Sequence, residues 1–265
     1  MLLALEIGNS NIHLGLFKAG ELIHHWTFKS DLTRSAEAYE VDLLSALRYR
    51  NIFPKDIGDV MVASVVRDLS SVFSALLRET FQKEPYFVTH RSDLGIKICY
   101  NPPEAVGIDR LLGVVAAYNI YGGPTIVVDI GTAVTFNVVS GDGEFLGGVI
   151  AAGPGLCAEA LLQKTDLLPF IEPEFPPQVI GRSTQDCLKS GLTYGTVELI
   201  DGLTQRIADE LSTETKVVAT GGLADPLLKR SRSVSTIDPF LVLKGLQIVH
   251  KRVEKGKCEK KREQL

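Results

Sequence analysis

Several signatures of common sites are missing from this sequence. Its four cysteines form no CxxC pair, its five histidines form no HExxH motif, and neither GxxxxGKS nor GxxxxGKT occurs. A structural zinc site and a P-loop nucleotide site are therefore not expected. The cysteines, at positions 99, 157, 187 and 258, are interpreted as buried or idle thiols in a reducing cytosol.

Excess positive charge and long apolar runs are absent as well. The formal net charge is −4, which gives no electrostatic reason to expect a nucleic acid or an anionic membrane as partner. No apolar run approaches the ~20 residues that cross a bilayer, and Met1 leads into the first predicted strand without a basic leader or a cleavage site. We expect a soluble, cytoplasmic protein whose binding site supplies its own positive charge.

Two similar stretches dominate what is present. Residues 127–139 predict a strand carrying Asp129, a turn on Gly131 and Thr132, and a second strand; residues 3–17 repeat this plan with Glu6 as the acid. Glycine lets backbone amides close around phosphate oxygens, and an acid beside phosphate requires a cation such as Mg²⁺ or K⁺ between them. Either stretch alone also fits an ordinary hairpin. Their repetition favours a duplicated domain that grips one ligand.

The length of 265 residues, 45% of them hydrophobic, accommodates one large domain or two similar domains, and the repeat favours two. Periodicity predicts an α/β protein whose first strands are antiparallel. After a third strand at 22–28, the first half predicts helix 35–50, strand 59–66, helix 70–82 and strand 85–89. The second half predicts helix 111–121, strand 144–150, helix 185–211, strand 216–220, helix 239–253 and a charged, frayed tail at 255–265.

A second chemical cluster spans residues 100–111 and places Asp109 and Arg110 in the first turn of the predicted helix. These residues fit a helix-terminal acid beside a solvated arginine. They also fit a site in which an acid orients a hydroxyl while a bidentate cation holds a carboxylate. Thr184 also has two interpretations: it is the N-cap of helix 185–211, or it contacts a ligand. The Gly221-Gly222 turn is either a plain turn or the entry for a flat nucleotide base.

In their order along the chain, these motifs resemble the sugar-kinase and actin superfamily, and more closely the type III pantothenate kinases. The resemblance runs from residue 3 to about 250 and rests on four stretches: Asn101-Pro102, Gly107 to Arg110, Asp129 to Ala133 and Gly147 to Ile150. It implies two duplicated ribonuclease H-like domains of the actin-like ATPase fold, with mixed central sheets flanked by helices. The domains would span 1–110 and 111–254, followed by the tail at 255–265.

The resemblance also implies ATP-dependent phosphorylation of pantothenate, the first step of coenzyme A synthesis, by a homodimer. It implies Mg²⁺ with ATP and a monovalent cation, K⁺ or NH₄⁺. The general base would be Asp109, and the cation ligand Asp129. By this resemblance the ATP-binding residues are Glu6, Ile7, Gly8, Asn9, Ser10, Asn11, Ile12, His13 and Thr132, and the substrate-binding residues are Tyr100, Gly107, Ile108, Asp109, Arg110 and Thr184.

The chain departs from the family pattern at two positions. Glu6 stands where the family has aspartate, and Ala152 where it usually has proline. The extra methylene of Glu6 changes the reach of a carboxylate at the metal–nucleotide complex, where geometry is sensitive to small shifts. The alternatives are therefore a catalytically weakened homologue that binds nucleotide or pantothenate as a regulatory protein, or another superfamily kinase or phosphoanhydride hydrolase.

Overall fold

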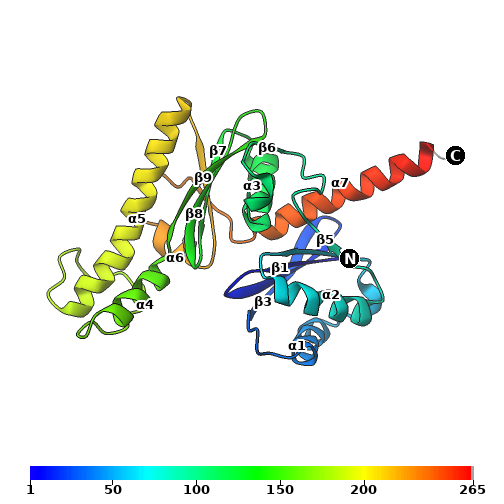
Figure 1. Cartoon of the computed structure of the whole chain (residues 1–265), viewed down its shortest axis with the longest axis horizontal. Coiled ribbons are helices and arrows are strands. Elements are labelled where there is room, and N and C mark those ends of the chain that lie inside the picture. Colours follow the sequence, from blue (N-terminus) through cyan, green and yellow to red (C-terminus); the bar gives the residue numbers. More distant parts are fainter. Residues whose placement is uncertain (264–265) are drawn as a thin grey trace. The chain divides into compact units, whose positions relative to one another are not determined.

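The chain folds into two compact units in a computed structural model that describes residues 1–263 (Figure 1). The first unit combines residues 1–116 with the chain from 241 onward, and the second comprises residues 117–240. The domain bounds expected from the resemblance, 1–110 and 111–254, concern the duplicated halves of the sequence and stay a prediction.

The first unit is built on a mixed sheet. Its strands lie in the order β3-β2-β1-β4-β5; β1, β2 and β3 are antiparallel, whereas β4 and β5 run parallel to β1. The parallel pairing places the carboxyl ends of β1 and β4 at the same edge of the sheet. The strands are β1 (Leu2–Ile7), β2 (Asn11–Lys18), β3 (Glu21–Lys29), β4 (Asp59–Ser64) and β5 (Tyr86–Phe87).

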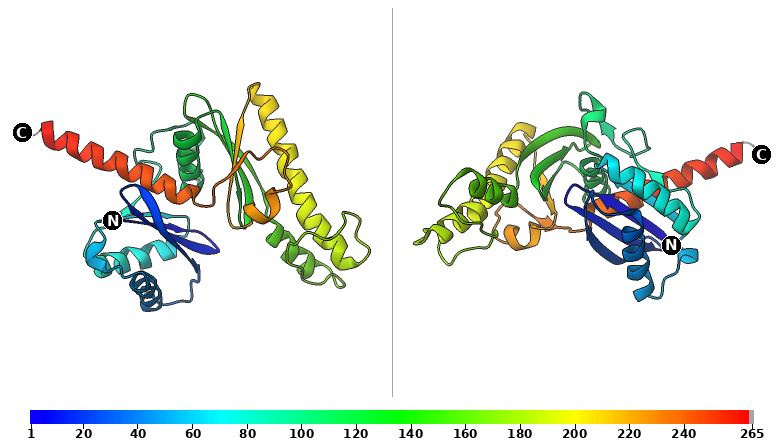
Figure 2. Two further views of the ribbon diagram at one scale, coloured as in Figure 1. Left: turned by 180° about the vertical axis from the view of Figure 1, so that it is seen from behind. Right: turned by 60° about the horizontal axis from the view of Figure 1, so that its bottom comes forward.

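Helices cover both faces of this sheet (Figure 2). Leu3, Leu5 and Ile7 alternate along β1 and pack in one core with buried side chains of α1 and α2. On β2, Gly15 lies against Leu243 of α7. The remaining elements of this unit are α1 (Ala36–Tyr49), η1 (Pro54–Asp56), α2 (Arg67–Phe81), β6 (Lys97–Ile98), η2 (Pro103–Ala105), the first turns of α3 (Ile108–Tyr121), and α7 (Leu241–Glu263).

The second unit repeats the strand plan of the first. Its strands follow the order β11-β10-β7-β8-β9, with β7, β8 and β9 antiparallel and β10 and β11 parallel to β7. This matches β5-β4-β1-β2-β3 position for position, so the predicted duplication with mixed, helix-flanked sheets is confirmed. Its elements are β7 (Thr125–Ile130), β8 (Ala133–Val139), β9 (Glu144–Ala152), α4 (Pro154–Lys164), α5 (Thr184–Leu211), β10 (Lys216–Thr220), α6 (Ala224–Leu228) and β11 (Thr236–Ile237).

The end of the chain differs from the expectation. The last helix, predicted to stop near residue 253, continues to Glu263. The added segment is rich in Lys and Glu, which are good helix formers, and Lys257 Nζ donates to Glu254 Oε1 at 2.8 Å along the same helix face. The predicted frayed tail is therefore wrong as far as residue 263, and its last two residues lie outside the described part of the chain.

Three of the cysteines, Cys99, Cys157 and Cys187, are free thiols. The side chain of Cys258 lies outside the described residues. Within residues 1–263, no helix combines the length and the apolar character needed to cross a membrane.

Candidate active site

The β1–β2 turn is tightly fixed by its own backbone. The amide of Gly8 donates to the carbonyl of Asn11 at 2.9 Å. Ser30, the residue that follows β3, donates through Oγ to the carbonyl of Gly8 at 2.5 Å. Asn9, Ser10 and Asn11 are exposed at the tip. The predicted phosphate loop is therefore a rigid turn whose outward face is made of polar side chains and amides.

Five of the predicted ATP-binding residues lie in β1 or β2: Glu6, Ile7, Asn11, Ile12 and His13. The side chains of Ile7 and Ile12 are fully buried in the core, so only their backbone groups face a ligand. Glu6 is half-buried and directly opposite His13 in the β1–β2 register. The Nδ1 atom of His13 lies 3.1 Å from Thr27 Oγ1. Burial, with a smaller effect of nearby His25, lowers the pKa of His13, so its imidazole is neutral at pH 7.

The predicted first helical turn at Asp109 and Arg110 is confirmed, since α3 begins at Ile108. Asp109 Oδ1 accepts a 2.7 Å hydrogen bond from the amide of Arg110. Burial raises the pKa of Asp109, although this amide and the Arg110 guanidinium oppose the rise. Ile108 is buried, so it can meet a ligand only through its backbone. The result is a desolvated carboxylate at the N-terminus of a helix.

Gly107 is what allows the carboxylate to lie there. A Cβ on residue 107 would stand 2.4 Å from Asp109 Oδ1, far inside van der Waals contact, and 3.7 Å from a methyl group of Val65. Val65 in turn donates its amide to the carbonyl of Ile7 at 3.1 Å. Val65 thus links the start of α3 to the carboxyl end of β1. Asp109 and the β1–β2 turn consequently belong to one edge of the first sheet.

The β7–β8 turn closes in the same way as its counterpart. The amide of Gly131 donates to the carbonyl of Ala133 at 3.0 Å, as Gly8 does to the first residue of β2. Asp129, like Glu6, is the penultimate residue of its strand. The second turn contains two residues, Gly131 and Thr132, between the strands, whereas the first contains three. The acid, glycine and polar tip found in both sequences therefore occupy equivalent places.

Two glycines bring further elements against this second turn. Gly221, with φ +98°, follows β10, and a Cβ there would stand 2.5 Å from Asp129 Oδ1. Gly153, the N-cap of α4, donates its amide to the carbonyl of Thr132 at 3.0 Å. A Cβ on Gly153 would stand 2.5 Å from that carbonyl oxygen. We call Asp129, Thr132, Gly153 and Gly221 the β7 cluster; it combines an acid, a hydroxyl and the N-terminus of a helix.

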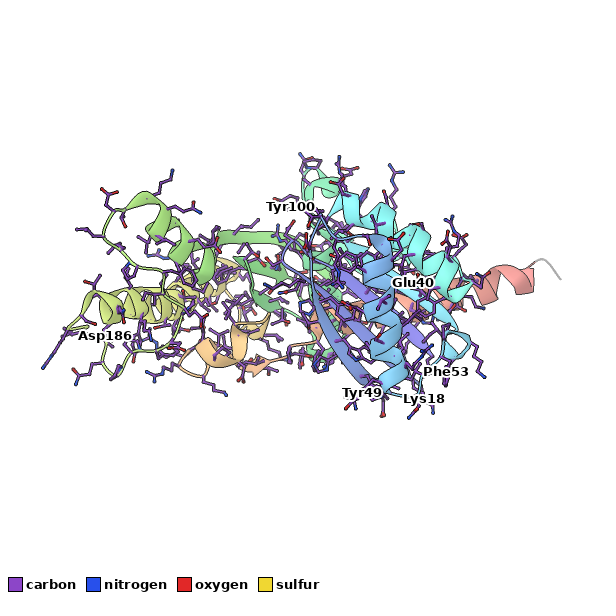
Figure 3. The ribbon with its side chains drawn as sticks, turned by 90° about the horizontal axis from the view of Figure 1, so that it is seen from below. Lys18, Glu40, Tyr49, Phe53, Tyr100 and Asp186 are labelled. Carbon is purple, nitrogen blue, oxygen red and sulfur yellow. The ribbon has the colours of Figure 1, made fainter. Side chains whose placement is uncertain are left out.

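Two of the predicted substrate residues belong to other segments of the chain. Tyr100 is half-buried on the loop before η2 in the first unit (Figure 3). Thr184 is exposed at the start of α5, at the end of the α4–α5 pair that is remote from the second sheet (Figure 1). The N-cap there is Ser183, whose Oγ accepts from the amide of Asp186 at 3.1 Å. The capping interpretation of Thr184 is therefore wrong, and a ligand role for this residue stays a prediction.

Sequence reasoning missed two residues that shape these sites, Ser30 and Val65. Each donates a hydrogen bond to a backbone carbonyl of a segment distant in sequence, and nothing in a single sequence identifies such a contact. For Gly153 the sequence did carry a signal, since the Gly-Pro-Gly stretch at 153–155 opens a helix with small residues that let another group approach closely.

Comparison with known proteins identifies the family. The family model described as type III pantothenate kinase matches residues 2–206. A type III pantothenate kinase of Moorella thermoacetica is 39% identical over 95% of this chain and 99% of its own length. The chain belongs to the type III pantothenate kinase family. A further type III pantothenate kinase, of Myxococcus xanthus, is also 39% identical, over 95% of this chain and 98% of its own.

Comparison with solved structures identifies the fold. A 2-dehydro-3-deoxygalactonokinase-like protein of Sinorhizobium meliloti superimposes with a TM-score of 0.57, covering 96% of this chain and 97% of its own. Its sequence is 14% identical, so the likeness concerns architecture alone. The predicted actin-like ATPase fold is confirmed.

The contact between Gly107 and Asp109 gives a direct test of the site. In Gly107→Ala, the new Cβ displaces the carboxylate, and a misplacement of ~1 Å in a reacting group lowers turnover about a hundredfold. The variant should therefore fold, as judged by circular dichroism, but lose most phosphoryl-transfer activity. Gly202→Ala on α5, where an added Cβ meets nothing within 4 Å, is the matched control and should keep full activity. Equal activity in both variants would contradict the proposed importance of this contact.

Proposed function

We propose that this protein transfers the γ-phosphoryl group of ATP to pantothenate, the first step of coenzyme A synthesis. The observation that carries the proposal is the desolvated Asp109 carboxylate at the N-terminus of α3, on the same sheet edge as the β1–β2 turn. The membership of the chain in the type III pantothenate kinase family supports the identity of the acceptor.

In this proposal Asp109 is the general base. It accepts the proton of the primary hydroxyl of pantothenate as the oxygen attacks phosphorus. Burial raises its pKa, which makes the carboxylate a better proton acceptor than an exposed aspartate. Gly107 and Ile108 approach pantothenate through their backbones, and Arg110 pairs with the carboxylate of pantothenate. Tyr100 and Thr184 make the remaining contacts with pantothenate.

Phosphate binding is proposed to rest on backbone amides and metal ions. Phosphoryl transfer has a loose transition state, so positioning and neutralisation of charge supply most of the acceleration. We propose that the stretch from Glu6 to His13 and the hydroxyl of Thr132 contact ATP; Glu6 would help to hold Mg²⁺, which would neutralise part of the phosphate charge. The neutral His13 contributes no charge, so the cation is needed.

Asp129 is proposed to bind the monovalent cation, K⁺ or NH₄⁺. Its half-buried carboxylate lies near the end of β7, and both this carboxylate and the Ile130 carbonyl face the Gly221 turn. Hard cations such as K⁺ prefer oxygen ligands. The same family resemblance supports a cytoplasmic homodimer, and exposed apolar side chains on α4, Leu156, Leu161 and Leu162, provide surface for a subunit contact.

Glu6 favours a second candidate function. A glutamate at this position carries the carboxylate one methylene further than the aspartate of the family pattern, which shifts any metal it helps to hold. The chain would then bind nucleotide or pantothenate as a regulatory protein with little turnover. The assay below separates the two functions.

The decisive experiment is an assay of the purified protein with ATP, Mg²⁺, K⁺ and pantothenate, coupled to ADP release. We expect ADP release that depends on pantothenate and a product heavier than pantothenate by one phosphate in the mass spectrum. Binding of ATP or pantothenate by calorimetry without product would favour the regulatory protein. Turnover of a sugar in place of pantothenate would indicate another kinase of the superfamily.

Asp109→Asn tests the general base. Loss of a base costs about two to four orders of magnitude in turnover, while the affinity for pantothenate should change little because the side chain keeps its shape. In the native enzyme kcat/KM should fall as the pH drops through a pKa above the ordinary aspartate value, since only the carboxylate accepts a proton. The variant should lack this acid limb. A retained limb would remove Asp109 from the mechanism.

Exchange of the monovalent cation tests Asp129. Replacing K⁺ by Na⁺ at constant ionic strength should lower turnover, because the smaller ion suits a different ligand spacing. Asp129→Asn should lower turnover in K⁺ and abolish the difference between the two salts. A native enzyme that responds equally to both salts would exclude the proposed cation role.

A further inference from the structure

A group of side chains that can act as metal ligands lies at the opposite edge of the first sheet, where β1 and β4 begin. Asp59 is the first residue of β4 and pairs in register with Leu2, whereas the β1–β2 turn and Val65 follow the carboxyl ends of β1 and β4. At ~3.3 Å per residue, the length of β4 separates the two edges by about 17 Å. This group is therefore separate from the proposed kinase site.

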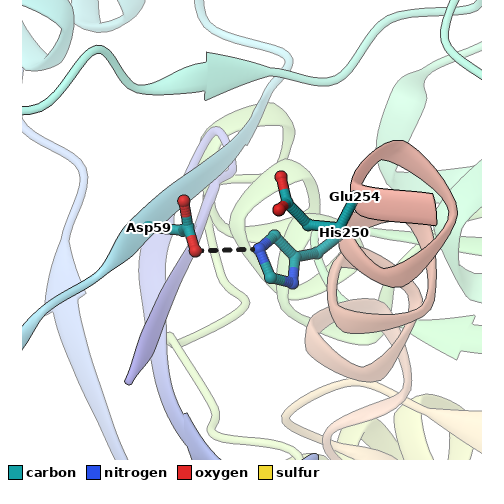
Figure 4. A group of neighbouring side chains, drawn as sticks. All are labelled: Asp59, His250 and Glu254. Atoms are coloured by element: carbon teal, nitrogen blue, oxygen red, sulfur yellow. Dashed lines mark ion pairs between the residues drawn. The ribbon is translucent and has the colours of Figure 1, made fainter. Parts of the chain in front are cut away.

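Asp59, His250 and Glu254 form the group (Figure 4). His250 and Glu254 are four residues apart on α7, so their side chains share one face of the helix. Nε2 of His250 lies 3.2 Å from Asp59 Oδ2. One ligand-type atom from each of the three residues lies within 4.8 Å of the other two. An imidazole and two carboxylates thus converge from two elements.

The imidazole nitrogen is unusual in its surroundings. Nε2 of His250 is buried, and within the described part of the chain it makes no hydrogen bond despite its closeness to Asp59. A buried polar atom without a partner is costly. Two ligands at 90–110° on an ion, each at the usual 2.0–2.2 Å, stand about 3.3 Å apart. The 3.2 Å separation between Nε2 and Oδ2 fits ligands that share one ion.

We propose that Asp59, His250 and Glu254 bind a divalent transition metal of the zinc type, which fastens α7 to β4. A mixed set of imidazole and carboxylates suits Zn²⁺ or Co²⁺, whereas Mg²⁺ and Ca²⁺ prefer oxygen ligands throughout. The side chains of Asp59 and Glu254 are 53% and 44% exposed, which leaves room for water as a further ligand.

Lys257 competes with the proposed metal for the carboxylate of Glu254. Its ammonium donates to Glu254 Oε1 at 2.8 Å. The ammonium offsets the charge of the two acids when no metal is bound. A metal has to displace it, so removal of the lysine charge should strengthen binding.

The test is calorimetric titration of ZnCl₂ into the full-length protein, after treatment with EDTA and without nucleotide or phosphate. We expect one equivalent to bind. His250→Ala and Asp59→Asn should each weaken binding by about tenfold or more, and Lys257→Gln should tighten it. His25→Ala, which removes an exposed histidine of β3, is the matched control and should bind as the native protein does.

A second readout is the melting temperature. Zn²⁺ should raise it in the native protein and in His25→Ala, because an ion that binds only the folded state stabilises that state, and it should not do so in Asp59→Asn. Asp59 is exposed, so this variant carries the test if His250→Ala fails to fold. Equal zinc affinity in Asp59→Asn and His25→Ala, or no binding by the native protein, would reduce the group to an ion pair and overturn the proposal.

Discussion

The position of the Asp109 carboxylate depends on the absence of a side chain at residue 107. Oδ1 occupies space that any Cβ there would fill, at a separation of 2.4 Å. The oxygen can therefore fold back against the start of α3 and accept the amide of Arg110. Burial separately raises the pKa of this carboxyl. The glycine thus controls the direction of the proposed base, and burial raises its proton affinity.

The repeated sheet topology explains why chemistry gathers at these turns. In each unit the first strand is flanked by an antiparallel partner and by a parallel one. The antiparallel hairpin and the loop that follows the parallel strand consequently meet at one edge. Val65 donates to Ile7 in the first unit, and Leu223 donates to Ile130 in the second. Duplication of the topology therefore duplicates the place where backbone amides and an acid are exposed together.

What could be predicted from the sequence was local. The acid, glycine and polar tip of each turn are adjacent in the chain, and the helical position of Asp109 follows from the periodicity of residues 111–121; both were correct. Contacts between distant segments could not be predicted. Three such contacts are Ser30 with Gly8, Val65 with Ile7, and Asp59 with His250. They depend on strand register and helix packing, which a single sequence does not reveal. Asp59 and His250 are also far apart in the chain, so no local motif such as HExxH marks them as a pair. The helix end at Glu263 was missed because a run of mixed charge is compatible with both a helix and a solvated tail.

The charge balance of the two turns limits how they can act on a phosphorylated ligand. Each turn presents a carboxylate near its tip, Glu6 or Asp129, and burial, with a smaller effect of His25, lowers the pKa of His13 beside the first turn. Backbone amides carry only partial positive charge, and a triphosphate carries several negative charges. Phosphate can approach these acids only with metal ions interposed, so the ions determine where the phosphates lie. Glu6 reaches one methylene further than aspartate, so in the proposed kinase its length would act on the nucleotide through the metal rather than by direct contact.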